Sequence, residues 1–448
     1  MTLVTLETEK KAAATPERIF GITAARERRL SRLLVFYVMT GLIFMLLPGT
    51  FLGVWNLMSI SSHRAPGTVS AGWIQAHGHA QIFGWIGTFI LGIGYYSIPK
   101  LRRMKPFALW APWTSWTLWT SGVALRWTTG VYEWHWRWLL PASAALEITA
   151  FLIFFVAVSG HRSEGTAKKP SEEWIFVVIA GSTGWFTALL IHLLAALYLS
   201  WQGNSPILPH SFDQRFLTLE TWGFLVPFVW GFGARWLPTF LGLREPRAPW
   251  LLRAVALNSM GILAALCGWM FVSTVLLLAG IATAAYALRV FEPGERTPKI
   301  KGVHSIFPVA IRLAYVWALV SAALAIWASV SPTMPAGIWG ASRHALTVGF
   351  LAMMVFAVGQ RILPAFSGMR LLFSTKLMFL ALLLLALGCF LRVSSEILAY
   401  QGYLPSAWSW LPVSAVVEMA AVTVFALNLV LTFASHRNRA TLPYREAA

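Results

Sequence analysis

The sequence is poor in cysteine and in charge. Its 448 residues include two cysteines, Cys267 and Cys389, and neither belongs to a CxxC or CxxCH motif. This excludes a CxxC redox pair and the covalent attachment of a c-type haem, and it indicates no disulfide. Charged residues make up 12% of the chain and hydrophobic residues 57%. Such a composition excludes an ordinary soluble enzyme and is typical of a polytopic membrane protein.

Acidic residues are scarce. There are 17 Asp and Glu against 35 Lys and Arg, for a net charge of +18. The basic residues gather in both terminal segments and at alternate helix ends, as in Lys100 to Lys105 and Arg244 to Arg253. This distribution follows the positive-inside rule and predicts a bacterial-type inner membrane protein with both termini in the cytoplasm. The charge therefore indicates contact with lipid headgroups and not with nucleic acid. The first 30 residues lack a short apolar core with a cleavage site, which predicts no cleavable signal peptide.

Long apolar stretches make up most of the chain, and the loops between them are too short for a soluble domain. A membrane-spanning helix needs about 20 predominantly apolar residues. Twelve stretches meet this requirement, at about 33–57, 72–98, 107–129, 138–160, 174–200, 214–241, 250–269, 271–291, 305–329, 341–367, 375–397 and 409–434. We therefore expect an all-α protein with twelve transmembrane helices and no soluble domain.

One helical segment occurs three times, at His79 to Pro99, Thr218 to Pro238 and His344 to Pro364. Each copy has glycine five and fifteen residues after its first position and proline twenty residues after it. Small residues allow close helix packing, which is the simplest interpretation of these glycines. Each copy is the second helix of a predicted four-helix unit. The three units are predicted at residues 31–160, 172–292 and 303–436. Residues 1–30 and 437–448 are predicted to be cytoplasmic segments before and after them.

Histidine opens only the first and third copies. His79 and His344 are predicted at matched depth on separate helices, which favours ligation of one haem iron from two sides. An interhelical hydrogen bond or a water-lined crevice stays open as the alternative. His77 precedes His79 by two residues, or about 200° around a helix, so the two side chains face different directions. We therefore expect His77 to bind at a second site or to contact solvent near the mouth of the helix bundle. His192 is a third-site ligand or, as we favour, a buried hydrogen-bonding residue.

Other polar residues also recur in the first and third units but not in the second. The third helices each contain a Leu-Arg pair, which ends at Arg126 and Arg392. The fourth helices each contain a proline followed six residues later by Glu147 or Glu418. The arginines are predicted to bind haem propionates, with snorkelling as the alternative. The glutamates are predicted to orient a ligating histidine or to relay a proton. Five further polar residues could bind copper: His63, Glu133, His135, His210 and Asp213. Their spacing is not that of a metal site, so they are interpreted as exposed loop residues.

Twelve spans in three such units, with a histidine on the second helix, resemble subunit I of the haem-copper oxidase superfamily. The resemblance implies that His79 (or His77) and His344 are the axial ligands of a low-spin haem. That family's oxygen-reducing centre also needs histidines on helices six and seven and a second one on helix ten. This sequence has no His-His pair and no histidine in the spans predicted at 214–241 and 250–269. The copper and haem centre that reduces oxygen is therefore predicted to be absent.

A closer resemblance is to the NnrS family of membrane proteins. It is carried by the early histidine-containing helix, by GARWLPTF at Gly233 to Phe240 and by HALTVG at His344 to Gly349. The family's Gly-His-Thr-Gly-Arg ending of this last helix is replaced by LPAFSG at Leu363 to Gly368. The resemblance implies twelve spans, haem, copper and a role in the response to nitric oxide.

The resulting interpretation is a membrane protein that binds non-covalent haem b and acts in nitric oxide handling, redox sensing or electron transfer. Whether it catalyses a reaction stays open. Two alternatives also stay open. One is a transporter of protons or a metal ion that uses His79, His344, Glu147 and Glu418, and the other is a non-catalytic oxidase-like subunit of a respiratory complex.

Overall fold

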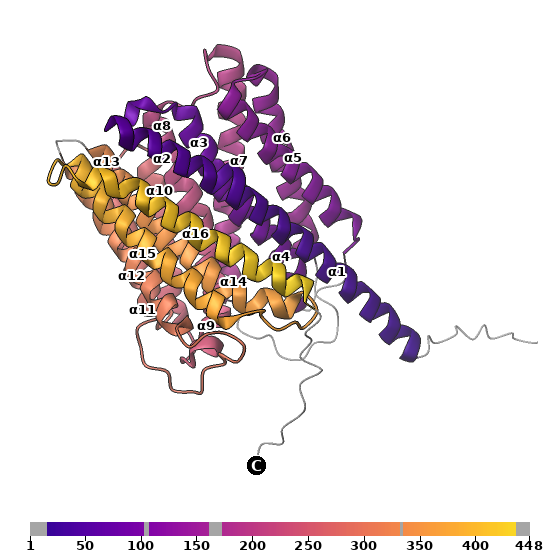
Figure 1. Cartoon of the computed structure of the whole chain (residues 1–448). Helices are drawn as coiled ribbons and strands as arrows, with labels where there is room; N and C mark the ends of the chain where they lie inside the picture. Colours follow the sequence, from indigo (N-terminus) through magenta and orange to yellow (C-terminus); the bar gives the residue numbers. More distant parts are fainter. Residues whose placement is uncertain (1–15, 103–106, 161–172, 332–334, 436–448) are drawn as a thin grey trace, which may run out of the picture.

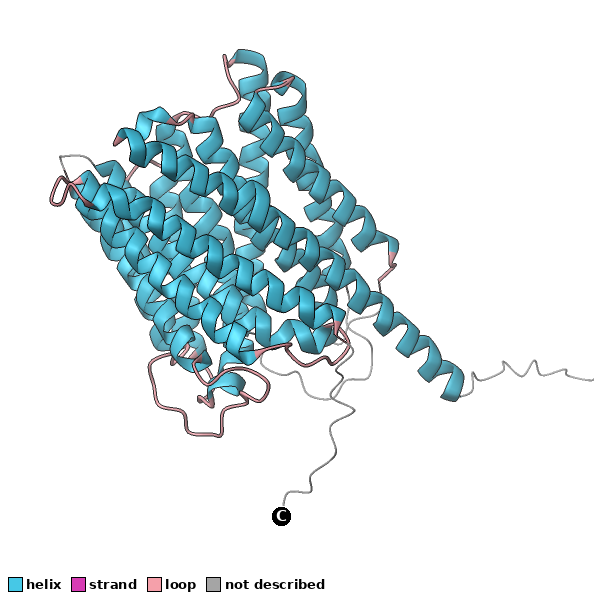
Figure 2. Cartoon of the chain, in the orientation of Figure 1, coloured by secondary structure: helices cyan, strands magenta, loops and turns pink. Residues whose placement is uncertain are grey.

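The computed structural model describes residues 16–102, 107–160, 173–331 and 335–435. All regular elements in these ranges are helices, and the long helices run side by side in one bundle (Figures 1 and 2). The predicted tail 437–448 and the first fifteen residues of the predicted N-terminal segment lie outside the described residues. The all-helical fold expected from the sequence is confirmed.

Several consecutive elements join end to end into one continuous helix, which we call a helical rod, and the helix type changes along such a rod. The first half of the chain contains α1 Pro16–Phe44, η1 Met45–Phe51, α2 Leu52–His63, η2 Pro66–Thr68, α3 Ala71–His79, η3 Ala80–Gly87, α4 Thr88–Leu101, α5 Trp110–Tyr132, α6 Trp136–Val158 and α7 Glu173–Gln202. The second half contains α8 His210–Thr218, η4 Leu219–Leu225, α9 Val226–Leu241, α10 Ala248–Leu266, α11 Met270–Ala287, α12 Phe307–Val330, α13 Pro335–His344, η5 Ala345–Ala352, α14 Met353–Phe366, α15 Thr375–Tyr400 and α16 Ala407–Ala434.

Eleven of these helical rods are long and apolar enough to cross a membrane. The stretch predicted at 107–129 is helical as α5, but α5 is not among the eleven. Its five tryptophans and its serines and threonines lower its mean hydropathy, and it packs against α6 and α3. The protein is thus a polytopic membrane protein, and the count of twelve spans stays a prediction.

The three repeated segments share a change in helix geometry. Each turns from α-helix to π-helix immediately after its first residue, at η3 after His79, at η4 after Thr218 and at η5 after His344. A π-helix places more residues in each turn, so side chains beyond the change face in directions that an unbroken α-helix would not give them. Such segments are frequent at functional sites. The division into three four-helix units stays a prediction.

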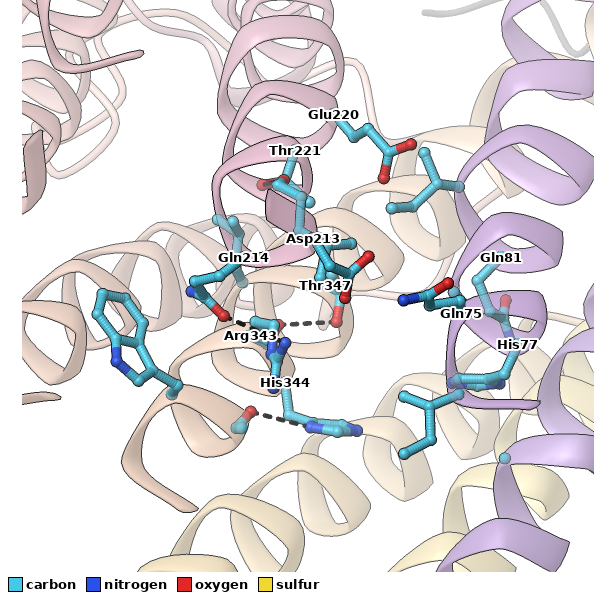
Figure 3. A pocket seen from close by; sticks show the side chains of 18 of the residues that line it. Gln75, His77, Gln81, Asp213, Gln214, Glu220, Thr221, Arg343, His344 and Thr347 are labelled. Atoms are coloured by element: carbon cyan, nitrogen blue, oxygen red, sulfur yellow. Dashed lines mark hydrogen bonds between the residues drawn. The ribbon is translucent and has the colours of Figure 1, made fainter. Parts of the chain in front are cut away.

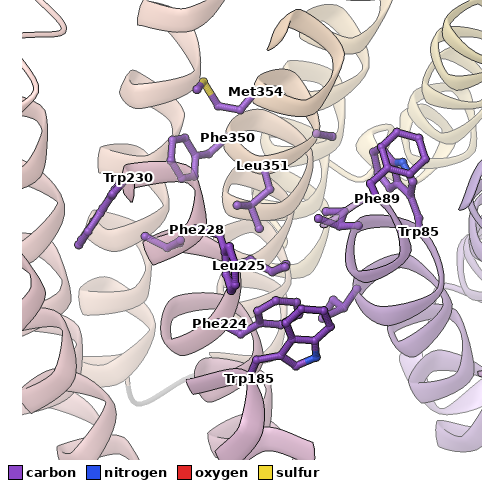
Figure 4. Close-up of a cluster of buried hydrophobic side chains, with 14 of the residues drawn as sticks. Trp85, Phe89, Trp185, Phe224, Leu225, Phe228, Trp230, Phe350, Leu351 and Met354 are labelled. Atoms are coloured by element: carbon purple, nitrogen blue, oxygen red, sulfur yellow. The ribbon is translucent and has the colours of Figure 1, made fainter. Parts of the chain in front are cut away.

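Aromatic side chains fill the centre of the bundle (Figure 4). The Trp185 ring of α7 stacks on Phe224 of η4, with ring centroids 4.3 Å apart. The two helices approach closely at Gly184, where an added Cβ would lie 1.9 Å from the carbonyl oxygen of Gly223. Gly223 is one of the repeated glycines, and its backbone contacts the neighbouring helix as a packing position should.

The two thiols provide a test of the predicted orientation. Cys267, just after α10, is exposed, and Cys389 in α15 is buried. If every rod crosses the membrane and the N-terminus is cytoplasmic, α10 ends at the outer face. We therefore expect a membrane-impermeant maleimide to label intact spheroplasts at Cys267, with labelling lost in Cys267→Ser. Labelling that requires permeabilised membranes would contradict this orientation.

Candidate functional site

A cavity of about 870 Å³ lies inside the bundle. Its volume falls within the range of about 300–1,000 Å³ that is usual for ligand and cofactor sites. Among the residues predicted to form the site, Glu147 does not line it. The others all do: His77, His79, Arg126, His192, His344, Arg392 and Glu418.

His344 is held at the end of α13 with one ring nitrogen engaged. Its Nδ1–H donates to the carbonyl oxygen of Gly340, at 3.0 Å, and the same nitrogen lies 3.6 Å from Oε2 of Glu396 on α15. With Nδ1 protonated, Nε2 carries the free lone pair. Figure 3 shows the ring pointing across the pocket toward the helix that bears His77.

His77 on α3 is held in the same way. Its Nδ1–H donates to the carbonyl oxygen of Gly49 in η1, at 2.9 Å. The ring lies against Gly53, where an added Cβ would be 2.6 Å from the His77 Cε1. Figure 3 shows His77 on the opposite side of the pocket from His344. Both imidazoles therefore have Nδ1 bound to a backbone carbonyl and Nε2 left for a ligand, which is the usual arrangement of a metal-bound histidine.

His79 belongs to a different group of side chains. Its Nε2 lies 2.9 Å from Oε1 of Glu147 on α6, and its ring centroid is 5.3 Å from that of His192 on α7. The Nδ1 of His192 lies 4.0 Å from Oε2 of the same glutamate. All three side chains are buried. The structure thus brings Glu147 and His192 to His79, and it places His344 with other partners.

The two predicted arginines both reach the cavity with free donors. Arg126 is 3% exposed and Arg392 is 8% exposed. Nε and Nη1 of Arg126 and Nη1 of Arg392 have no hydrogen-bond partner within the described part of the chain. Arg392 lies near Glu396, with Nη2 at 3.5 Å from Oε2. Because a buried unpaired donor is costly, this geometry favours an anionic group of a bound molecule.

The two predicted glutamates lie at equivalent places. Glu147 packs against Gly122, and Glu418 packs against Gly388, with the would-be Cβ of each glycine 2.7 and 2.6 Å from the Cγ of its glutamate. Glu147 contacts a histidine, whereas Oε1 of Glu418 is buried without a partner among the residues that the structure describes. The carboxylate beside His344 is Glu396 instead.

The family model described as NnrS protein matches residues 34–437. The chain belongs to the NnrS family. No curated protein matches this NnrS-family chain. A similar solved structure is a haem-copper terminal oxidase dimer, determined by cryo-electron microscopy. It superimposes with a TM-score of 0.67 at 15% identity over 91% of this chain and 85% of the other. At this identity the likeness shows the fold alone, and it confirms the predicted resemblance to haem-copper oxidases.

Sequence reasoning missed two acidic residues at the site of this NnrS-family chain, Glu396 and Glu220, and misplaced a third, Asp213. Glu396 follows Arg392 by one helical turn in an apolar helix, and this spacing was a usable signal. Glu220 is 4% exposed within η4. Asp213 was interpreted as an exposed loop residue, but it lies in α8 and lines the cavity (Figure 3).

Of the predicted loop histidines, His63 and His135 are ordinary surface residues, whereas His210 lines the cavity. His63, His135 and His210 are exposed, and none belongs to a group of three potential metal ligands within the described ranges. His63 ends α2 and His210 begins α8, so these two lie at helix ends and not in loops.

Proposed function

We propose that this NnrS-family chain is a membrane haem protein that holds one non-covalent b-type haem between His77 and His344. The supporting observation is that two imidazoles on α3 and α13 line one cavity of about 870 Å³ from opposite sides. Each has its Nδ1 bound to a backbone carbonyl, which leaves Nε2 for the iron. A haem with two histidine ligands is held from two helices in this manner.

The remaining polar lining also fits a haem. The unpaired donors of Arg126 and Arg392 are suited to the two propionates, since a guanidinium binds carboxylates through forked hydrogen bonds. Glu396 lies next to both His344 and Arg392 and can hold each of them in place. His77, His344, Arg126 and Arg392 would hold the haem through two imidazole nitrogens and two guanidinium groups, without a covalent link.

The choice of His77 over His79 follows from their partners. His79 directs Nε2 to Glu147, whereas the Nε2 of His77 has no protein partner among the described hydrogen bonds. The repeat register favours His79, because it begins the copy as His344 does. Register and geometry therefore make different predictions, which substitutions can separate.

A second, apolar cavity favours a small uncharged ligand such as nitric oxide. It has a volume of about 110 Å³ and shares Ile86, Leu225 and Leu351 with the wall of the larger cavity. Apolar cavities of this kind admit small nonpolar molecules. When bound, the haem would supply a redox-active iron that can bind nitric oxide. We therefore propose nitric oxide binding, with electron transfer through the haem as the second candidate.

The test is spectroscopic. Protein purified in detergent from haem-replete cells should show a low-spin b-type spectrum, and acid-acetone should extract the haem. Anaerobic mixing of the reduced protein with nitric oxide should shift the Soret band, whereas oxygen should not be consumed over many turnovers. A haem that is inert to nitric oxide would favour electron transfer. A colourless folded protein would contradict the proposal and favour the transporter.

A further inference from the structure

We propose that the smaller, apolar cavity, here called the central cavity, is a docking site for a small nonpolar gas molecule. A ring of three side chains is its passage to the larger cavity. The ring consists of Ile86, Leu225 and Leu351, which line both cavities. The identity of the gas, nitric oxide, rests on the proposed function, whereas the site itself rests on the geometry of the repeated segments alone.

The three repeated segments build the central cavity between them. Every residue that lines it belongs to the segments 79–99, 218–238 and 344–364. Each segment contributes the residues that lie seven, ten, eleven and fourteen positions after its first residue. Three helices that turn the same register toward one space surround it with approximate threefold symmetry. The ring is the set of residues at position seven, and Figure 4 shows Leu225 and Leu351 from this set.

The ring is a constriction, and the space beyond it is wider. The ring residues are at most 8% exposed. The residues at position eleven, Ile90, Val229 and Val355, pack against the hydrophobic core and are nevertheless only partly buried in all three segments. Because these residues line the central cavity, its wall accounts for part of their exposed surface. A molecule that moves between the two cavities therefore has to pass the buried side chains of the ring.

Repeated glycines leave part of this space unfilled. Gly233 and Gly359, at position fifteen, line the central cavity. An added Cβ at Gly233 would lie 3.4 Å from Leu237 of its own helix, and one at Gly359 would have its nearest neighbour at 3.7 Å. The equivalent Gly94 does not line the cavity, and an added Cβ there would be 2.7 Å from the ring of Phe154. Gly94 is thus a packing position, whereas the other two glycines face open space.

The size and the lining of the central cavity favour a small nonpolar occupant. Its volume of about 110 Å³ lies below the range of about 300–1,000 Å³ that is usual for organic ligands and cofactors. A buried water needs about two to four polar partners. The lining consists only of Gly, Val, Leu, Ile, Met, Phe and Trp residues. An apolar cavity of about 150 Å³ with such a lining stays dry and binds xenon. Nitric oxide is small and uncharged, so it suits this lining, whereas an ion does not.

Xenon tests the site without any haem, because it binds in dry apolar cavities and is located by its anomalous scattering. In pressurised crystals of the full-length protein, we expect a xenon atom between Ile90, Val229 and Val355. Val229→Phe and Val355→Phe lie on different helices, and each should lose the xenon because the larger side chain enters the cavity. Val424→Phe is the matched control. Val424 is partly buried on α16 and lines neither cavity, so this variant should keep the xenon.

Nitric oxide tests the passage in the haem-loaded protein. After flash photolysis of the reduced nitrosyl protein, the bimolecular rate of rebinding should fall by about fivefold in Val229→Phe and Val355→Phe, which corresponds to a barrier higher by about 1 kcal/mol. Leu351→Ala widens the ring and should raise the rate instead. Val424→Phe should leave the rate unchanged. A merely structural role of these residues would not predict opposite effects of filling the cavity and of widening the ring.

The site and the passage can fail separately. Absence of xenon from the unmodified protein, or xenon that remains in both Val229→Phe and Val355→Phe, would overturn the site. Xenon in the central cavity together with unchanged nitric oxide rates in all variants would overturn the passage. A colourless protein that binds xenon would contradict the proposed haem, and with it the passage, but not the site.

Discussion

Replacing His344 with alanine is expected to abolish haem binding. The haem content per chain, measured as the pyridine haemochromogen, should fall by at least about tenfold, because even changes behind a metal ligand cost that much. His344 is the one imidazole of α13 that reaches the cavity, and its Nδ1–H is fixed by Gly340. The same loss is expected for His77→Ala.

His79→Ala is the control that separates geometry from repeat register. We expect this variant to retain a low-spin haem spectrum, because the Nε2 of His79 is engaged with Glu147. Loss of the haem in His79→Ala together with its retention in His77→Ala would show that the register prediction is correct. Retention of a full haem complement in His344→Ala would contradict both assignments.

Gly184→Ala is expected to destabilise the protein strongly. An added Cβ would lie 1.9 Å from the carbonyl oxygen and 2.4 Å from the carbonyl carbon of Gly223. Both atoms are backbone, so α7 and η4 would have to separate where Trp185 stacks on Phe224. Overpacking of this kind costs about 1–3 kcal/mol and occasionally more. Thermal unfolding in detergent should show a midpoint lowered by several degrees, with less monodisperse protein recovered.

Gly359→Ala is the matched control for this substitution. Gly359 lies in a membrane helix, as Gly184 does, but the atom nearest to an added Cβ is 3.7 Å away, which is ordinary contact. The thermal unfolding midpoint of the Gly359→Ala variant should therefore change little. Equal midpoints for Gly184→Ala and the unmodified protein would show that the two helices do not approach as closely as described.

Composition and spacing were sufficient for the class of fold. Runs of apolar residues long enough to span a bilayer predict membrane helices because no water is present to satisfy exposed backbone groups. The repeated glycines and prolines identified one helix in three copies, and all three change to π-helix at the same residue. The intramembrane residues His79, His344, Arg126 and Arg392 were found because buried polar groups in a membrane are costly and therefore functional candidates.

The partners of these residues were decided only by the tertiary structure. Helical periodicity gives the direction of a side chain around its own axis, but it does not say which helix lies opposite. It could not predict that His79 meets Glu147 and His192, nor that Glu396 and not Glu418 lies beside His344. Copies of a repeat share their internal spacing while their neighbours differ, so equal register does not give equal contacts. The sequence by itself therefore determined the membrane fold and the polar residues within it, and the packing of the helices decided how those residues are grouped.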